Sequence, residues 1–298
     1  MIDRCIANER ESALKRSLDD LLDIYGPGDL ESDPVMFLHR YEDPADVEVV
    51  GFVAASLAFG RVSQIKKSIS AILDLMGASP GKFVENFEPA RDSELFEGFV
   101  HRFTKGKDLA VLCHLLGQMV KGWGSIESFM FGGSRSPRDV GELLDDFSRR
   151  ALTLDVTGSY PGGVIPEGAR VRYFFPSPSG GSACKRLNLF LRWMVRGPDG
   201  VDLGIWRNLL PSELVVPMDV HVGRISRLLG LTRYKGNSWR SAVEVTESLK
   251  RLDAKDPTKY DYAVTRLGIL GVCQRGRKDL NCDPCPLSEH CVNRPEAM

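Results

Sequence analysis

The residues best suited to chemistry are four cysteines near the C-terminal end of the chain: Cys273, Cys282, Cys285 and Cys291. Their spacing is C-x8-C-x2-C-x5-C. Two cysteines separated by two residues bring both sulfurs to one metal centre within a tight turn, and the flanking thiolates complete the set. Four thiolates suit a [4Fe–4S] cluster or a Zn²⁺ ion, and the residue types alone do not separate the two. The other three cysteines, Cys5, Cys113 and Cys184, are scattered, and we expect them to be reduced packing residues.

A second candidate is a carboxylate at a predicted helix start. In the segment PMDVHVGR, from Pro217 to Arg224, Asp219 follows a proline and precedes a helical pattern that Gly230 ends. An aspartate at such a position is a common N-cap, so a structural role alone explains it. A carboxylate at the same place can also stabilise positive charge or accept a proton, which is the functional alternative.

A third candidate is the start of a predicted helix over 183–196. Gly180-Gly181-Ser182 precede this helix, and glycines let the backbone come close to a phosphate at a helix N-terminus. One face of the helix is apolar and is predicted to be core. The other face carries a polar line that either is solvated or faces phosphate: Lys185, Asn188, Arg192 and Arg196.

The elements that must position these residues are predicted to be helices. Apolar residues recur with helical spacing, or a cap and a stop enclose the segment, over eight ranges: 11–25, 46–59, 62–76, 107–121, 138–153, 183–196, 219–229 and 260–271. Asp46 is the expected cap of the second. Residues 158–181 hold six Gly, four Pro and three Ser, which predicts a long loop with at most a small hairpin around Glu167-Gly168. The chain is therefore predicted to be all-α.

Composition excludes several classes of protein. Hydrophobic residues are 43% and charged residues 27%, which excludes a disordered chain and a collagen-like fibre. The apolar run 49–59 is too short to cross a membrane, because a spanning helix needs about 20 residues. The N-terminus shows no apolar signal segment, so we expect a cytoplasmic protein without membrane contact. The net charge of −1 divides into −8 over 1–170 and +7 over 171–298, which permits a basic face in the C-terminal part.

Two segments together resemble the endonuclease III superfamily of DNA glycosylases. The stretch Cys282-Asp-Pro-Cys285-Pro-Leu is similar to the C-terminal cysteine loop of that superfamily. Asp219, His221 and Arg224 match all three positions of the segment that bears its catalytic aspartate.

The resemblance extends to Lys185, which occupies the place of the superfamily's nucleophilic lysine. The chain lacks the usual Leu-Pro-Gly-Val-Gly hairpin, its first cysteine gap is longer than in typical members, and 34 residues separate Lys185 from Asp219. A divergent hairpin and a wide Lys–Asp gap are similar to the archaeal 8-oxoguanine glycosylase branch. The chain as a whole also looks like a bacterial family of unknown function.

This resemblance implies a helix-hairpin-helix glycosylase-like fold of two helical lobes. Residues 26–212 would form a barrel lobe with the loop 158–181 inserted. Residues 1–25 and 213–298 would form the second lobe, with a four-cysteine metal loop at 273–291 and the active site in the groove between the lobes. Many members carry a [4Fe–4S] cluster, so the resemblance favours that cofactor, with zinc as the alternative.

The implied activity is base excision repair of DNA, in which the damaged base is extruded into a pocket. Lys185 would attack the sugar with help from Asp219, on an oxidised purine such as 8-oxoguanine, with AP-lyase activity as a further step. In a monofunctional variant Asp219 would activate water instead. We expect a monomer that binds damaged duplex or single-stranded DNA through five residues: Gly180, Gly181, Arg186, Arg192 and Arg224.

Other residues have weaker claims. Arg61 and a basic group in the cysteine loop (Arg275, Arg277 and Lys278) are further candidates for DNA contact. The acidic residues Asp43, Asp46 and Glu48 are predicted to be capping or solvated. Five aromatic residues could stack a flipped base but are predicted to be core, and none is assigned to the site: Tyr173, Phe174, Phe175, Trp193 and Trp206. Two other functions stay open, namely a non-catalytic iron–sulfur nucleic-acid-binding protein on a glycosylase scaffold and a zinc interaction module without a nucleic-acid role.

Overall fold

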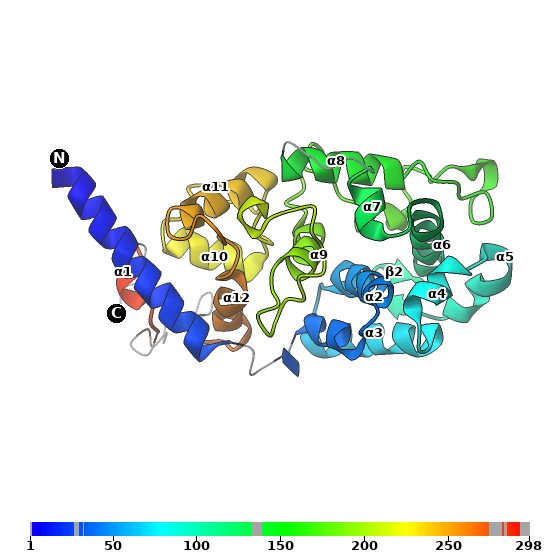
Figure 1. The fold of residues 1–298 in the computed structure, drawn as a ribbon, viewed down its shortest axis with the longest axis horizontal. Helices are drawn as coiled ribbons and strands as arrows, with labels where there is room; N and C mark the ends of the chain where they lie inside the picture. The colour runs from blue at the N-terminus through cyan, green and yellow to red at the C-terminus, as the bar shows by residue number, and fades with distance from the viewer. Residues whose placement is uncertain are drawn as a thin grey trace. The chain divides into compact units, whose positions relative to one another are not determined.

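The computed structural model describes residues 2–26, 30–31, 33–132, 139–273, 282 and 285–292, with side chains from residue 9 onward. The described chain is mainly helical, and its strands form one two-stranded sheet (Figure 1). It divides into two compact units. The terminal unit comprises Met1–Asp29, Gly181–Asn188 and Leu210–Met298, and the middle unit comprises Leu30–Gly180 and Leu189–Leu209. The division predicted from the sequence assigned 181–188 to the middle lobe, whereas these residues belong to the terminal unit.

The middle unit is built around α6 (Gly106–Trp123), whose apolar side chains are almost all buried. α6 contacts neighbours on several sides, among them α4, α5, α7 and the strand β2. The other helices of this unit are α2 (Pro44–Leu57), α3 (Val62–Met76), α4 (Pro80–Glu85), α5 (Pro89–Asp92), α7 (Ile126–Met130) and α8 (Val140–Ala151). Short 3-10 helices lie at Pro34–Arg40, Ser93–Phe96, Pro161–Gly163 and Arg170–Phe174.

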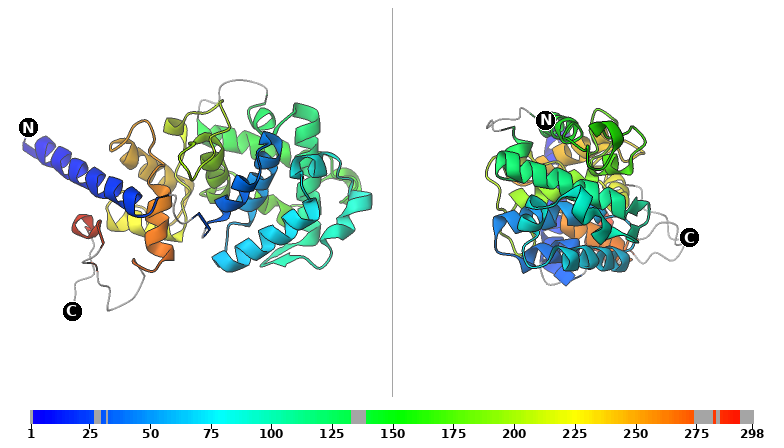
Figure 2. Two further views of the ribbon diagram at one scale, coloured as in Figure 1. Left: turned by 60° about the horizontal axis from the view of Figure 1, so that its bottom comes forward. Right: turned by 90° about the vertical axis from the view of Figure 1, so that its right-hand side faces the viewer.

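The terminal unit contains four helices in the described residues: α1 (Ile2–Ile24), α10 (Val220–Leu228), α11 (Trp239–Lys250) and α12 (Asp261–Ile269). α1 lies against α12, as both Figure 1 and Figure 2 show. Its apolar stripe is buried there, and the Tyr260 hydroxyl donates to Asp19 Oδ1 at 3.0 Å. The C-terminal segment joins the same unit, because Val292 N donates to Leu228 O at 2.7 Å. Two short 3-10 helices lie at Pro211–Glu213 and Ser288–His290.

α9 (Lys185–Val195) begins in the terminal unit and continues into the middle unit. Its expected apolar stripe is confirmed, since Leu187, Phe190, Leu191 and Met194 are all at most 2% exposed. The Phe190 ring meets Phe52 edge-on at 5.2 Å between centroids.

Most predicted helices are confirmed within a few residues, but two details are wrong. The cap of α2 is Asp43, whose Oδ1 accepts from Ala45 N at 2.9 Å, and not Asp46. The sequence placed a possible hairpin around Glu167-Gly168, where the structure has a turn followed by a 3-10 helix. The observed hairpin pairs β1 (Val100–His101) with β2 (Thr104–Lys105).

The glycine- and proline-rich segment 158–181 contributes side chains to the core of the middle unit. Five of its apolar side chains are buried: Tyr160, Ile165, Val171, Phe174 and Phe175. The Phe175 ring lies 5.6 Å from Phe52 and 5.8 Å from Phe147, between centroids. Among the described residues, the helices include none that is both long and apolar enough to cross a lipid bilayer.

Candidate functional site

The structure brings together the two residues to which the resemblance gives chemistry. Lys185 Nζ lies 3.8 Å from Asp219 Oδ2, although 34 residues separate them in the chain. The Lys185 side chain is 32% exposed and the Asp219 side chain 14% exposed, so the pair is sheltered but open to solvent. An amine and a carboxylate at this distance form an ion pair that a bound molecule can still enter.

The two carboxylate oxygens of Asp219 make different contacts. Oδ1 accepts from His221 N and Val222 N, both at 2.8 Å, and so caps α10. Oδ2 is directed at Lys185. The N-terminal end of α10 also stabilises the negative charge of this carboxylate, because the helix dipole is positive there. The predicted N-cap is therefore confirmed, and it leaves one oxygen for chemistry.

A tight turn sets the position of Lys185. Gly181 has a φ of +81° and Cys184 a φ of +47°, so the chain enters the left-handed region twice within four residues. Ser182 Oγ accepts from Cys184 N at 3.1 Å, and the buried Cys184 side chain anchors the turn. Lys185 is then the first residue of α9. A left-handed conformation at a non-glycine residue costs energy and is common at functional sites.

The polar line on α9 was predicted either to be solvated or to face phosphate, and three of its four residues do neither. Asn188, Arg192 and Arg196 are between 1% and 7% exposed, so this face is neither solvated nor available to phosphate. Arg192 lies 3.2 Å from Asp202, and Arg196 pairs with the same carboxylate. Arg192 is therefore wrong as a DNA-binding residue, because its charge is neutralised inside the middle unit.

The other residues predicted to contact DNA differ in their exposure and in their contacts. Gly180 and Gly181 are exposed, and Arg186 is half-buried. Burial lowers the pKa of Arg186 to about 10, which still leaves it cationic at neutral pH. Arg224 donates from Nη1 to Cys273 Sγ at 2.7 Å and from Nη2 to Cys273 O. Arg224 is half-buried, and its guanidinium is engaged with the first cysteine of the predicted metal set.

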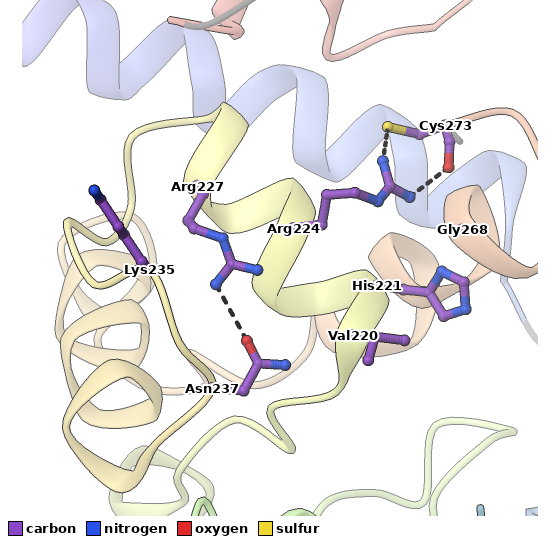
Figure 3. Close-up of a pocket in the computed structure, with 8 residues that line it drawn as sticks. All are labelled: Val220, His221, Arg224, Arg227, Lys235, Asn237, Gly268 and Cys273. Carbon is purple, nitrogen blue, oxygen red and sulfur yellow. Dashed lines mark hydrogen bonds between the residues drawn. The ribbon is translucent and has the colours of Figure 1, made fainter. Parts of the chain in front are cut away.

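A basic pocket of about 650 Å³ lies on the terminal unit beside this arginine (Figure 3). The described residues that line it include no carboxylate: Val220, His221, Arg224, Arg227, Lys235, Asn237, Gly268 and Cys273. Arg227 Nη1 donates to Asn237 Oδ1 at 3.1 Å, and Asn237 Nδ2 donates to Asp219 O at 2.7 Å. This chain of bonds connects the pocket to the backbone of Asp219. Such a concentration of positive charge suits an anion such as a phosphate.

Two of these pocket residues were missed from the sequence. Arg227 and Lys235 come from α10 and from the segment before α11, and no motif connects them. Gly268 on α12 gives the pocket its shape, since a Cβ atom there would lie 2.2 Å from His221 Nδ1. Only a residue without a side chain allows His221 to pack against α12 in this way.

The four C-terminal cysteines are all among the described residues, and each is partly exposed. Burial raises the pKa of the Cys285 thiol, and the negative charges of Cys273 and Cys282 raise it further. Within the part of the chain that the structure describes, no three His, Cys, Asp or Glu side chains are close enough to hold a metal ion. The donor set still suits a thiolate-bound centre in its chemistry, with the Arg224 guanidinium on Cys273 to offset negative charge. The basic group Arg275, Arg277 and Lys278 lies outside the described residues.

The acidic cluster near α2 has a structural role, but only Asp43 is a helix cap, and Asp46 and Glu48 are buried rather than solvated. Asp43 caps α2, and Asp46 Oδ1 accepts from Gly81 N at 2.7 Å. Glu48 accepts from Ile126 N at 2.8 Å and from Trp206 Nε1 at 2.6 Å. Burial raises the pKa of Glu48 above its usual range. The same contacts confirm that Trp206 belongs to the core, whereas Tyr173, for which the same was expected, is 56% exposed.

Comparison with known proteins gives one family. A family model described as "Protein of unknown function (DUF2400)" matches residues 33–270. Lys185, Asp219 and the pocket residues on α10 lie inside this range, and the four C-terminal cysteines lie beyond it. No curated protein and no solved structure matches the chain.

Proposed function

Because the chain belongs to the DUF2400 family, whose description states no activity, we propose its function from the site itself: a DNA N-glycosylase that acts on oxidised purines. The observation that carries the proposal is the 3.8 Å approach of Lys185 Nζ to Asp219 Oδ2. The resemblance of the Asp219 segment to the endonuclease III superfamily gives this pair its chemistry. The two-lobed helix-hairpin-helix architecture belongs to the same proposal.

The proposed reaction begins with Lys185 as the neutral amine. Its nitrogen attacks the sugar C1′ atom, and the bond from C1′ to the base breaks with its electron pair leaving on the base. The bond from C1′ to the ring oxygen then opens, the oxygen takes a proton, and a Schiff base joins Lys185 to C1′. Asp219 Oδ2 is placed to accept the proton from the lysine and to stabilise positive charge on the sugar. Asp219 Oδ1 keeps the carboxylate oriented throughout, because its two backbone donors hold it in place.

DNA binding is proposed to use the basic pocket rather than the predicted arginine line. Arg227 and Lys235 carry positive charge into the pocket, and Asn237 orients Arg227. A phosphate seated there would be recognised by charge and by hydrogen bonds, without any base contact. Gly180 and Gly181, which are exposed, and Arg186 are still predicted to contact the DNA strand that carries the lesion.

The cysteine loop is proposed to hold a [4Fe–4S] cluster or a zinc ion in a structural role. Cys273, Cys282, Cys285 and Cys291 would be its ligands, with Arg224 compensating charge. Cys285→Ser should lower the metal content of the purified protein, measured by elemental analysis. Cys113→Ser is the matched control, because Cys113 is buried in α6, far in sequence from the four cysteines. Equal metal in Cys285→Ser and in the unaltered protein would contradict this assignment.

A panel of oligonucleotides, each with one damaged base, tests the proposed activity. Release of free base is measured in single-turnover reactions, with 8-oxoguanine and other oxidised purines in duplex and single-stranded form. Lys185→Gln should abolish or slow release, and Lys250→Gln should not, because Lys250 forms a surface pair with Glu247 on α11. Binding without release across the panel would favour the non-catalytic nucleic-acid-binding protein.

A further inference from the structure

We infer that the middle unit carries a surface that stacks the unpaired bases of single-stranded DNA, formed by Phe59, Phe103 and Tyr173. The rings of Phe59 and Phe103 are stacked, with centroids 4.8 Å apart and an interplanar angle of 16°. The Tyr173 ring lies beside this stacked pair, with its centroid 5.3 Å from that of Phe103 and its plane tilted by 58°. We call these three side chains the aromatic surface.

Two of the three rings of the aromatic surface are exposed to solvent, and Phe59 is half-buried. Phe103 is 37% exposed and Tyr173 is 56% exposed, whereas most other phenylalanines of this unit are buried. The members come from three separate segments: the connection between α2 and α3, the tip of the β1–β2 hairpin, and the 3-10 helix at Arg170–Phe174. Rings from three segments that converge and remain exposed do not arise from packing of a single amphipathic element.

The buried side chain of His101 fixes the tip of the β1–β2 hairpin in position. His101 is fully buried, with Nε2 bonded to Phe59 O at 3.0 Å and Nδ1 to Ser68 Oγ at 2.9 Å. Arg102 follows with a φ of +55°, which turns the chain so that Phe103 lies at the tip. The buried histidine therefore anchors an exposed aromatic residue, which limits the loss of conformational freedom when a base stacks on it.

The charge around the aromatic surface matches a nucleic-acid backbone. Arg61, Arg102 and Arg170 are exposed and flank the rings in sequence, and Arg170 donates to Phe103 O. The three segments 59–61, 100–105 and 170–173 contain five Lys or Arg residues and no acidic one. A protein partner that only needed apolar contact would not require this bias.

Unpaired bases fit this surface better than a duplex does. The faces of bases in a duplex are covered by their neighbours, so an exposed ring can stack only on a base that has been freed. Stacking also tolerates any base, because each has a π-face. The inference deepens the proposed function by naming single-stranded DNA as the partner, and it rests on that function only for the choice of DNA over RNA.

Fluorescence anisotropy with labelled oligothymidylate of about 16 nucleotides, the upper end of common site sizes, tests the inference. Phe103→Ala and Tyr173→Ala should each raise Kd about 5- to 150-fold. Trp123→Ala is the matched control and should leave Kd unchanged, since Trp123 is a 43% exposed aromatic at the far end of α6. Its Cα lies about 25 Å along the helix from that of Gly106, the residue that follows β2.

A second variant tests the charge without straining the fold. Arg102→Gly removes a cation at a positive φ that glycine adopts readily, and it should weaken binding and reduce its dependence on salt. Equal Kd values for Phe103→Ala, Tyr173→Ala and the unaltered protein would overturn the inference. Tighter binding to a matched duplex or to oligouridylate would also overturn it. Oligothymidylate binding that Asp219→Asn leaves intact separates this result from failure of the proposed base excision.

Discussion

The two oxygens of Asp219 allow its structural and chemical roles to be separated by substitution. Asp219→Asn keeps an oxygen that can accept from His221 N and Val222 N, since asparagine caps helices as well as aspartate does. It removes the negative charge beside Lys185. Asp219→Ala removes both the cap and the charge.

The expected magnitudes follow from these contacts. Loss of a cap that accepts two bonds at 2.8 Å costs about 1 to 2 kcal/mol of unfolding free energy. Loss of the charge alone forfeits the partly exposed Lys185 pair and part of the helix-dipole term, about 1 kcal/mol or less. Asp219→Ala should therefore be less stable than Asp219→Asn by the cap term, about 1 to 2 kcal/mol, because both variants lose the charge. Both should slow base release about 10²- to 10⁴-fold.

Urea unfolding followed by circular dichroism measures the stability difference, and single-turnover base release measures the rates. Asp139→Asn is the matched control, because Asp139 caps α8 through Gly141 N and is distant in sequence from both candidate residues. It should leave the rate unchanged. Asp219→Asn with full excision activity would refute the chemical role, and equal stability of the asparagine and alanine variants would refute the capping role.

Three further predictions concern charges that the structure explains. Asp202→Asn should destabilise the protein by about 3 to 5 kcal/mol in urea unfolding, because Arg192 and Arg196 would stay buried without the carboxylate they share; a loss below about 1 kcal/mol would contradict this. Burial raises the pKa of Asp19, but hydrogen bonds from Lys15, Tyr260 and Lys259 bring it below its ordinary value of 3.8. The contribution of Asp19 to stability is therefore present above pH 3.8 and is lost as the pH falls through the lowered pKa. Asp19→Asn should thus lower the melting temperature at neutral pH but not in acid below the lowered pKa, and a pH-independent difference would count against the assignment. Arg227→Ala should weaken DNA binding and reduce the slope of log binding constant against log salt concentration by about 1. Arg224→Ala should lower the metal content with little change in that slope. A slope that changes in Arg224→Ala and not in Arg227→Ala would reject the pocket as the phosphate site.

The helices and the Asp219 cap could be predicted because their causes are local. A stripe such as Ile65, Ile69, Ile72 and Leu73 gives α3 its period, and Gly77 ends it. Asp219 after Pro217 has the composition of a helix start, and the structure confirms the cap. The β1–β2 hairpin escaped prediction because strands of two residues carry no periodic signal.

The polar residues were harder to predict, because periodicity gives the face of a helix but not its neighbour. Arg192 and Arg196 lie on one line of α9, and the carboxylate that neutralises them comes from Asp202, after the helix has ended. Arg224 was assigned to DNA by its place in a motif, whereas its contact is Cys273, 49 residues away. Lys235 and Arg227 join one pocket only through the fold.

Borohydride trapping detects the covalent step assigned to Lys185, because borohydride reduces a Schiff base between the lysine and the sugar to a stable bond. The purified protein is mixed with a lesion-containing oligonucleotide and reduced, and the products are separated under denaturing conditions. We expect a covalent protein–DNA adduct that disappears in Lys185→Gln and persists in Lys250→Gln. An adduct that survives in Lys185→Gln, or no adduct with any substrate that loses its base, would contradict the assignment of Lys185 as the nucleophile.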